Sequence, residues 1–306
     1  MPLTYDQISA ITEKKFIPKL VDNIFDSNPT LKILKEKSYE KVSGGTSIMV
    51  PLNYATNSAT GWYSGADTLD TTDNDTITAA EFAWKQIYSN ITIRRIDEIK
   101  NSGDAAMVNF VKSKVQIAEK TVSDTMGTAI YNTGSDSKAI AGFRHAFANT
   151  NTVGGIAQAT YSWWNAQKDA TTATLTLSAL QTQYQLCTID NDKPDLLTFT
   201  RANFNRYYNL LQPQQRFMDS KMADAGIESL MFHGAPCVVD SHVPAAHIFL
   251  LNTKYIMLAV HPDEDFRFEP FSKPINQNVK LAKIYWAGNL CFSNLRLCGM
   301  FTGITA

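Results

Sequence analysis

The sequence has 306 residues, of which 44% are hydrophobic and 19% are charged, and this composition is typical of a packed globular protein. Its 28 Lys and Arg residues nearly balance its 29 Asp and Glu residues. The balance argues against a protein that grips nucleic acid or a membrane through a basic surface. Because no run of about 18 or more apolar residues occurs, no transmembrane helix is expected.

The common enzyme signatures are missing from the sequence. It contains neither a GxGxxG nor a GxxxxGK[ST] phosphate-binding loop, and neither a GxSxG nor an HExxH motif. The four cysteines carry no CxxC spacing, and they lie scattered at Cys187, Cys237, Cys291 and Cys298. Scattered cysteines without a signal peptide predict reduced thiols in the core of a protein made in a cytoplasm. We therefore expect no cofactor and no catalytic site.

Residues 1–42 are predicted to form an N-terminal arm. Ile8, Ile11 and Phe16 give a short apolar stripe at helical spacing, and Pro18 then interrupts it. Lysines and acidic residues alternate along the rest of the segment. This mixture favours a solvated or partner-facing segment with a modest apolar face.

A long two-stranded ribbon is predicted over residues 43–95. Alternation of apolar and polar residues predicts one strand at Ser47–Tyr54 and a longer one from Ile77 to Ile93. The longer strand is expected to place three aromatic residues on one face: Phe82, Trp84 and Tyr88. With ~20 residues in each arm the ribbon would reach ~65 Å, so it would project from the core. A ribbon of two strands is marginal alone, so it needs a neighbouring surface.

The ribbon is acidic. No Lys or Arg occurs between Lys41 and Lys85, whereas four aspartates cluster beyond Trp62, at Asp67, Asp70, Asp73 and Asp75. Basic residues follow directly in the sequence, at Arg94, Arg95, Lys112 and Lys114. An acidic segment and a basic one therefore stand next to each other in the chain.

The clearest predicted helix covers residues 102–131. Apolar residues recur there at intervals of three or four: Val108, Val111, Val115, Ala118, Val122, Met126 and Ala129. Such a helix would be ~43 Å long. Asn132, Thr133 and Gly134 then give a stop signal.

The rest of the chain reads as mixed helix and strand. Residues 149–176 are predicted to be an irregular connection, and helices are predicted at Leu177–Ile189 and at Arg201–Leu211, the second capped by Thr200. The predicted strands are Asp195–Thr200, Ile227–Phe232, Cys237–Asp240, Ile248–Leu251, Tyr255–Val260, Phe266–Phe268, Val279–Trp286 and Asn289–Phe301.

A metal or thiol site is one alternative for the second half of the chain. Its candidate residues are His233, Cys237, His242 and His247, whose spacings approach those of metal ligands. The prolines between them and the strand and turn pattern favour ordinary structural roles instead. The letters Asp-Ser-His at 240–242 suggest a catalytic triad, but neighbouring residues of a strand point to opposite faces, so no relay is expected.

Trp163 and Trp164 allow two interpretations. They could stack on bases of single-stranded nucleic acid, or they could pack in the core. No Lys or Arg lies between Arg144 and Lys168 to form a basic groove, so packing is favoured.

The order of these segments resembles the tailed-bacteriophage major capsid protein family with the HK97-type fold. Local matches are the stretch Trp62-Tyr63-Ser64-Gly65, where Ser64 replaces the family's acidic residue, and Ala141-Gly142-Phe143 after the long helix. Residues 194–204 and 231–239 resemble the family's strand–helix unit and its glycine-proline turn. The resemblance covers roughly residues 1–303 and rests on order and patterning.

The resemblance implies an α+β fold with four parts. These are an N-terminal arm at 1–42, an extended β-hairpin loop at 43–95, a peripheral domain at 96–190 and 255–306 that contains the spine helix 102–131, and an axial α/β domain at 191–254. The lysine that some members use for an isopeptide bond near the ribbon tip has no counterpart between residues 42 and 84.

The implied function is that of a non-enzymatic structural head protein. Many copies, as hexamers and pentamers, would assemble in the bacterial host cytoplasm into the virion shell, which would enclose double-stranded DNA without sequence-specific binding. A separate scaffolding protein and a portal are implied partners, and no membrane is involved. Subunit contacts are expected at the apolar residues Ile8, Ile11, Phe16, Trp62 and Trp84, and between the ribbon aspartates and Arg94, Arg95, Lys112 and Lys114 of a neighbour.

Two other functions stay open. An encapsulin-like compartment has the same fold and a similar size but encloses cargo proteins. A cytoplasmic metal- or thiol-dependent enzyme built on His233, Cys237, His242 and His247 belongs to a different class.

Overall fold

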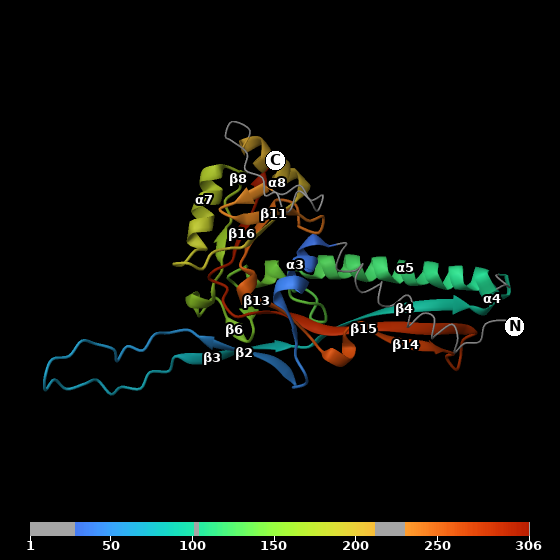
Figure 1. The fold of residues 1–306 in the computed structure, drawn as a ribbon, viewed down its shortest axis with the longest axis horizontal. Helices are drawn as coiled ribbons and strands as arrows, with labels where there is room; N and C mark the ends of the chain where they lie inside the picture. Colours follow the sequence, from blue (N-terminus) through green and yellow to red (C-terminus); the bar gives the residue numbers. More distant parts are fainter. Residues whose placement is uncertain (1–27, 101–103, 212–229, 306) are drawn as a thin grey trace.

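A computed structural model describes residues 28–100, 104–211 and 230–305. It has three parts: a body with helices α7 and α8, an elongated body under helix α5, and a ribbon that projects at the opposite end (Figure 1). The chain exposes 17140 Å² of surface, whereas a compact chain of this size exposes roughly 13,000 Å². The predicted arm contacts Ile8, Ile11 and Phe16 lie outside the described residues.

The elongated body is built on strand β15 (Val279–Phe292). Strand β4 (Lys85–Arg94) pairs antiparallel with residues 279–288 along one edge. Along the other edge β14 (Arg267–Ser272) pairs with the first half of β15 and β13 (Ile256–Val260) with the second half. β1 (Tyr39–Lys41) adds to β13 in parallel and completes a five-stranded sheet.

The sequence predicts two strands where β15 runs without a break. The predicted interruption at Ala287 and Gly288 is wrong, because both residues pair with β4 and Gly288 also pairs with Val260 of β13. A Cβ at position 288 would lie 2.4 Å from the carbonyl oxygen of Ala259. Glycine is thus needed here for a close approach of strands and does not mark a turn.

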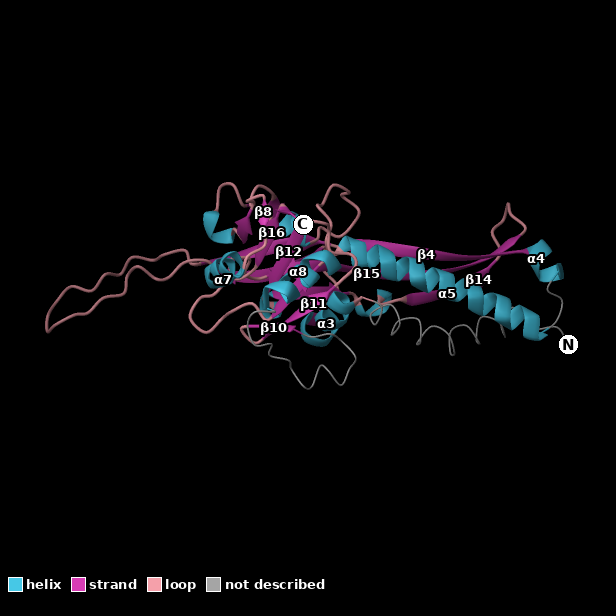
Figure 2. Ribbon diagram, turned by 90° about the horizontal axis from the view of Figure 1, so that it is seen from above, coloured by secondary structure: helices cyan, strands magenta, loops and turns pink. Residues whose placement is uncertain are grey.

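Helix α5 (Asp104–Ala129) lies along β4 and is the predicted spine. Its 26 residues give a rod of about 39 Å. Of the predicted apolar stripe, Val111, Val115, Ala118, Val122 and Met126 are buried and Ala129 is half-buried. A short helix, α4 (Arg95–Lys100), which the sequence reading missed, joins β4 to the far end of the body (Figure 2).

The paired strands of the ribbon are shorter than predicted. Strands β2 (Ser47–Asn53) and β3 (Ile77–Ala83) pair antiparallel, and residues 54–76 beyond them contain no strand. The predicted single strand from Ile77 to Ile93 is wrong, because it divides at Trp84 into β3, which pairs with β2, and β4, which pairs with β15. The aromatic residues predicted to share one face therefore lie in different surroundings: Phe82 of β3 is buried, whereas Tyr88 of β4 is 67% exposed.

The second body contains a six-stranded sheet in the order β10-β11-β9-β12-β16-β7. These strands are β7 (Gln167–Asp169), β9 (Leu196–Phe199), β10 (Leu230–Phe232), β11 (Ala235–Val239), β12 (His247–Leu251) and β16 (Gly299–Thr302). Helices α7 (Leu177–Leu186) and α8 (Arg201–Leu211) belong to the same body. The predicted cap of α8 is present, because the Thr200 hydroxyl accepts a hydrogen bond from the Asn203 backbone N–H. β7 and β16 lie outside the predicted axial range 191–254, so strand pairing crosses that boundary.

Short elements fill the connections. They are α3 (Pro29–Ser38), α6 (Phe143–Ala146), β5 (Thr152–Val153), β6 (Ile156–Ala157), η2 (Ser162–Trp164), β8 (Ala173–Thr174), η3 (Thr253–Tyr255), η4 (Pro262–Glu264) and β17 (Ile304–Thr305). The connection at 149–176 is therefore more ordered than predicted. Pro29 begins α3, because the first helical position needs no N–H donor.

A buried polar network joins the spine to the second body. Tyr131, just beyond α5, donates a hydrogen bond to Asp240 at 3.2 Å and shares a second one with Thr30 of α3 at 2.8 Å. All three residues are buried. Burial and the charge of Asp240 raise the pKa of Tyr131 well above its ordinary value, so the phenol stays neutral and keeps its proton for this contact.

We expect Tyr131→Phe to destabilise the chain by about 1.5–3 kcal/mol, the range for a hydrogen bond to a charged group. The ring contacts with Phe143 and Phe249 stay, but the buried carboxylate loses a donor. Chemical denaturation measures the change. Tyr88→Phe, at an exposed position, is the matched control and should alter stability by less than about 0.5 kcal/mol. Equal effects of the two substitutions would show that the network does not hold the bodies together.

Candidate assembly interface

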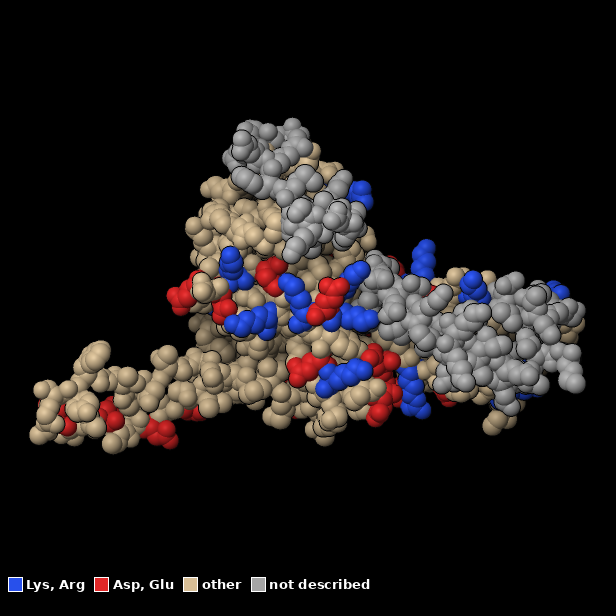
Figure 3. Space-filling view, viewed as in Figure 1, with Lys and Arg blue, Asp and Glu red and all other residues tan. Residues whose placement is uncertain are grey.

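Residues 61–73, which form the tip of the ribbon, are all exposed. Trp62 is 105% exposed and Tyr63 is 69% exposed. The aspartates at 67, 70, 73 and 75 are exposed too, and within residues 28–100, 104–211 and 230–305 none of them forms an ion pair. In the space-filling view the ribbon shows acidic and neutral atoms (Figure 3). The ribbon therefore presents aromatic and acidic groups whose partners must come from elsewhere.

Local hydrogen bonds shape the acidic tip. Asp67 accepts a hydrogen bond from the Ser64 backbone N–H at 2.8 Å. Asp70 accepts two from Thr72, one from the backbone N–H at 2.9 Å and one from the hydroxyl at 2.6 Å. The Thr72 hydroxyl, followed by its backbone N–H, lowers the pKa of Asp70. This carboxylate thus keeps its charge in mildly acidic solution.

The predicted basic partners lie at the other end of the molecule. Arg94 ends β4 and Arg95 begins α4, at the end of the body farthest from the ribbon (Figure 1). Both are exposed, as is Lys112 of α5, whereas Lys114 is half-buried with its ammonium 5.5 Å from the centre of the Phe110 ring. Segments adjacent in sequence are therefore separated in space within one chain, and contact between them requires a second copy.

Trp84 is placed by contacts within its own chain. It is half-buried, its indole N–H donates to the carbonyl of Gly45 at 3.0 Å, and its ring meets His261 edge-on at 5.6 Å. It stands where β3 ends and β4 begins, so it anchors the base of the ribbon. The role of Trp84 as a subunit contact stays a prediction.

A groove lies at the same base. Tyr54 stacks on Trp163 with ring centres 5.2 Å apart, and Asp75, Glu81 and Tyr161 complete an open space of about 540 Å³. The neighbouring Trp164 is buried and donates to the Val153 carbonyl at 3.0 Å. The packing interpretation of the two tryptophans is thus confirmed for Trp164.

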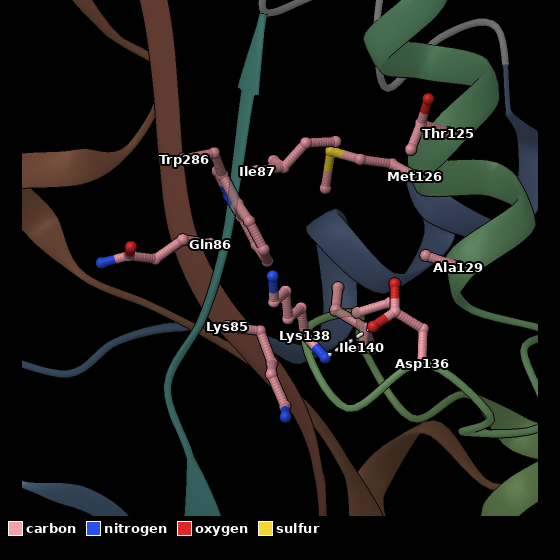
Figure 4. A pocket seen from close by; sticks show the side chains of 11 residues that line it. Lys85, Gln86, Ile87, Thr125, Met126, Ala129, Asp136, Lys138, Ile140 and Trp286 are labelled. Carbon is pink, nitrogen blue, oxygen red and sulfur yellow. Dashed lines mark hydrogen bonds between the residues drawn. The ribbon is translucent and has the colours of Figure 1, made fainter.

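A second pocket, missed from the sequence, opens between the spine and the sheet (Figure 4). Met126 and Ala129 of α5 face Ile87 of β4 and Trp286 of β15 across a space of about 200 Å³. Its charged residues are Lys85, Asp136 and Lys138. Lys85 donates to the Ser137 carbonyl and so holds the loop that carries the other two. No sequence pattern pointed to this site, because its walls come from three distant segments.

The candidate ligands of a metal site are dispersed. His233 contacts Gln181 at 2.5 Å, Cys237 is buried in β11, and His247 bonds to the Ala245 carbonyl at 2.7 Å. In the part of the chain that the structure describes, no group of three or more His, Cys, Asp or Glu side chains is arranged to hold a metal ion. The alternative metal site therefore has no geometric support in these residues.

His242 does contact Asp240, contrary to the sequence interpretation. The expected strand geometry is wrong, because residues 241 and 242 lie in a turn after β11. Nδ1 of His242 is 3.1 Å from one Asp240 oxygen, and Nε2 is 3.0 Å from Asp124 of the spine. Carboxylates thus occupy both ring nitrogens, and His242 joins the spine to the second body.

Known structures share this architecture. The cyanophage A-1(L) capsid chain aligns with a TM-score of 0.66 and 16% identity, over 91% of this chain and 93% of that one. A capsid chain of a native GTA particle aligns with a TM-score of 0.63 and 14% identity, over 89% and 90%. An encapsulin complex from Synechococcus elongatus aligns with a TM-score of 0.58 and 8% identity, over 89% and 87%.

The chain has the HK97-type capsid fold. The predicted α+β class is confirmed with it. No protein-family model matches the sequence, and no curated protein shows significant sequence similarity to it. Among the described residues of this HK97-type chain, no helix is long and apolar enough to cross a membrane.

We expect the native thiols to resist labelling. Cys187, Cys237, Cys291 and Cys298 are free and buried. Burial raises the pKa of Cys298 to about 12 and raises the other three as well, so at pH 8 the reactive thiolate is scarce in the folded chain. A colorimetric thiol reagent should find no fast-reacting thiol in native protein and four per chain after denaturation. Fast, stoichiometric labelling of native Cys237 would revive the thiol-enzyme alternative.

Proposed function

We propose that this chain is the structural major capsid protein of a tailed bacteriophage. The observation that carries the proposal is the alignment with phage and GTA capsid chains, which covers 91% and 89% of this chain and 93% and 90% of those chains. In this function many copies form hexamers and pentamers of a closed shell, the virion head, around double-stranded DNA. A separate scaffolding protein and a portal are the proposed partners, and assembly takes place in the cytoplasm of the bacterial host.

The near-zero net charge supports this function. A container whose DNA is packaged from outside needs no strongly basic surface, and the sequence carries 28 basic against 29 acidic residues. Between residues 42 and 84 the ribbon carries only acidic charges, whereas the body carries charges of both signs (Figure 3). Copies of one chain can therefore attract each other end to side, and many modest contacts can add up to a stable shell.

An encapsulin-like compartment is the second candidate function. It is favoured by the alignment with the encapsulin complex from Synechococcus elongatus and by a second one, with a TM-score of 0.53, to a virus-like particle from Pyrococcus furiosus. The contents of the assembled particles distinguish the two functions. Nuclease-protected DNA inside the particles supports the head protein, and a co-purifying cargo protein supports the compartment.

The first expected outcome is the formation of particles. Purified full-length chain, alone or expressed with its scaffolding protein, should elute near the void volume of a sizing column and appear as hollow particles tens of nanometres across by negative-stain microscopy. Many identical subunits with closed symmetry give such objects. A clean small oligomer under both conditions would contradict the shell function.

The second expected outcome concerns charge. We propose that Asp67, Asp70, Asp73 and Asp75 meet basic groups of a neighbour, with Arg94, Arg95, Lys112 and Lys114 as candidates. Exposed ion pairs contribute little individually, so they set register and orientation, while apolar contacts of Trp62 and of Ile8, Ile11 and Phe16 contribute more. Reversing all four aspartates to Lys should lower shell yield about tenfold or more and remove its sensitivity to salt.

Particle yield across a salt series measures this effect. A control reverses two exposed acids away from the ribbon, Asp190→Lys and Asp263→Lys, and should leave yield unchanged. Unchanged yield and salt sensitivity in the ribbon variant would show that the aspartates do not pair with a neighbour.

A further inference from the structure

Trp62 is an apolar side chain without a place to pack. It is 105% exposed, on a ribbon segment that has no strand partner beyond Asn53 and Ile77. Large apolar side chains exposed together with other apolar groups mark contact sites. Tyr63 and Leu69, at 69% and 59% exposed, accompany it. The exposed apolar side chains at the ribbon tip therefore indicate a contact site.

The pocket beneath the spine has the size and lining to cover it. Its walls are mainly apolar, from Ile87, Met126, Ala129, Ile140 and Trp286 (Figure 4). A dry cavity of about 150 Å³ accepts a benzene ring, and this pocket of about 200 Å³ has room for the larger indole ring.

Charge at the pocket matches charge on the ribbon. Lys85 and Lys138 line the pocket together with one acid, Asp136, which leaves a net positive side. The ribbon brings only acids to meet it, since no Lys or Arg occurs from residue 42 to residue 84. Opposite charge at the edge of an apolar contact favours one orientation over its reverse.

The occupant must come from another copy of the chain. The ribbon leaves the body in the direction away from the spine, and the pairing of β2 with β3 fixes that direction (Figures 1 and 2). The ribbon of a chain therefore extends away from the pocket of the same chain.

We propose that Trp62 of one copy inserts into the pocket between α5, β4 and β15 of a second copy, with Lys85 and Lys138 facing the ribbon aspartates. This contact rests on the proposed shell function and names the anchor point of the ribbon within it. It is a head-to-side contact, in which each copy offers one tip and one pocket, so it joins copies into rings or larger assemblies and not into closed pairs.

The contact also sets a register for the ribbon. From Lys85 to Arg94, strand β4 spans about 30 Å at ~3.3 Å per residue, and the segment from Asp67 to Asp75 reaches about 26 Å when extended. With Trp62 anchored at the Lys85 end, the aspartates extend along the neighbour's body toward Arg94 and Arg95. Anchor and charge pairing are therefore compatible in one arrangement.

Crosslinking tests the contact directly. Ser64→Cys places a thiol next to Trp62, and Lys138→Cys places one at the mouth of the pocket; both positions are exposed, while the native cysteines are buried. A short bis-maleimide should link the full-length double variant into a ladder of more than two chains. Adding Trp62→Ala should reduce the ladder at least about tenfold, as expected for loss of an aromatic anchor.

The control pair is Ser64→Cys with Lys273→Cys, an exposed lysine in the turn after β14, at the end of the sheet far from the pocket; it should give no ladder. A ladder from this pair, no ladder from the first pair, or a ladder that survives Trp62→Ala overturns the proposal. Loss of the ladder with Phe16→Ala but not with Trp62→Ala would assign the pocket to the N-terminal arm, and also overturns it.

The two proposals fail separately. A Trp62-dependent ladder from a chain that forms only small oligomers contradicts the shell function but supports this contact. Hollow particles that give no ladder support the shell function but contradict this contact. Since Trp62 is fully exposed, Trp62→Ala should leave the thermal unfolding of the unassembled chain unchanged, and this measurement separates loss of contact from loss of folding.

Discussion

The structure depends on strand β15 and the way in which it is paired along both edges. Its 14 residues hold β4 on one side and β14 and β13 in succession on the other. Because most of this strand is paired on both edges, it leaves little open ladder, so it can support a body that is long and thin. The spine helix buries its apolar stripe on this platform. The reach of the molecule, spine at one end and ribbon at the other, follows from that pairing.

Rigidity across the two bodies comes from polar contacts as well as apolar ones. The spine meets the second body through Tyr131, Asp240 and His242, in a setting where a buried carboxylate has to keep its donors. Such a network tolerates one arrangement of the bodies and penalises others. A shell needs subunits of uniform shape, and a junction of this kind provides a physical means of keeping the angle between the bodies fixed.

The net charge close to zero conceals a strong segregation. Acidic groups alone occupy the ribbon, and basic groups occur along the body at the opposite end. A compact protein would let these groups neutralise each other within one chain. Here the distance between them prevents it, so the attraction is available to neighbouring copies. The same holds for apolar surface, because Trp62 and the pocket beneath the spine are separate in one chain and complementary between two.

Periodic patterns in the sequence were sufficient to predict the spine, strand β2, helix α8 with its Thr200 cap, and the exposed acidic tip, because those features depend on neighbours within a few residues. The division at Trp84, the unbroken course of β15 through Gly288 and the turn that brings His242 to Asp240 could not be predicted, since each depends on a partner more than 25 residues away or on a local turn without a signal. The pocket beneath the spine belongs to the same class. The sequence by itself determined which segments are helical, apolar or charged; only the tertiary structure decided which of them meet, because strand pairing and close packing select among partners that local pattern leaves equivalent.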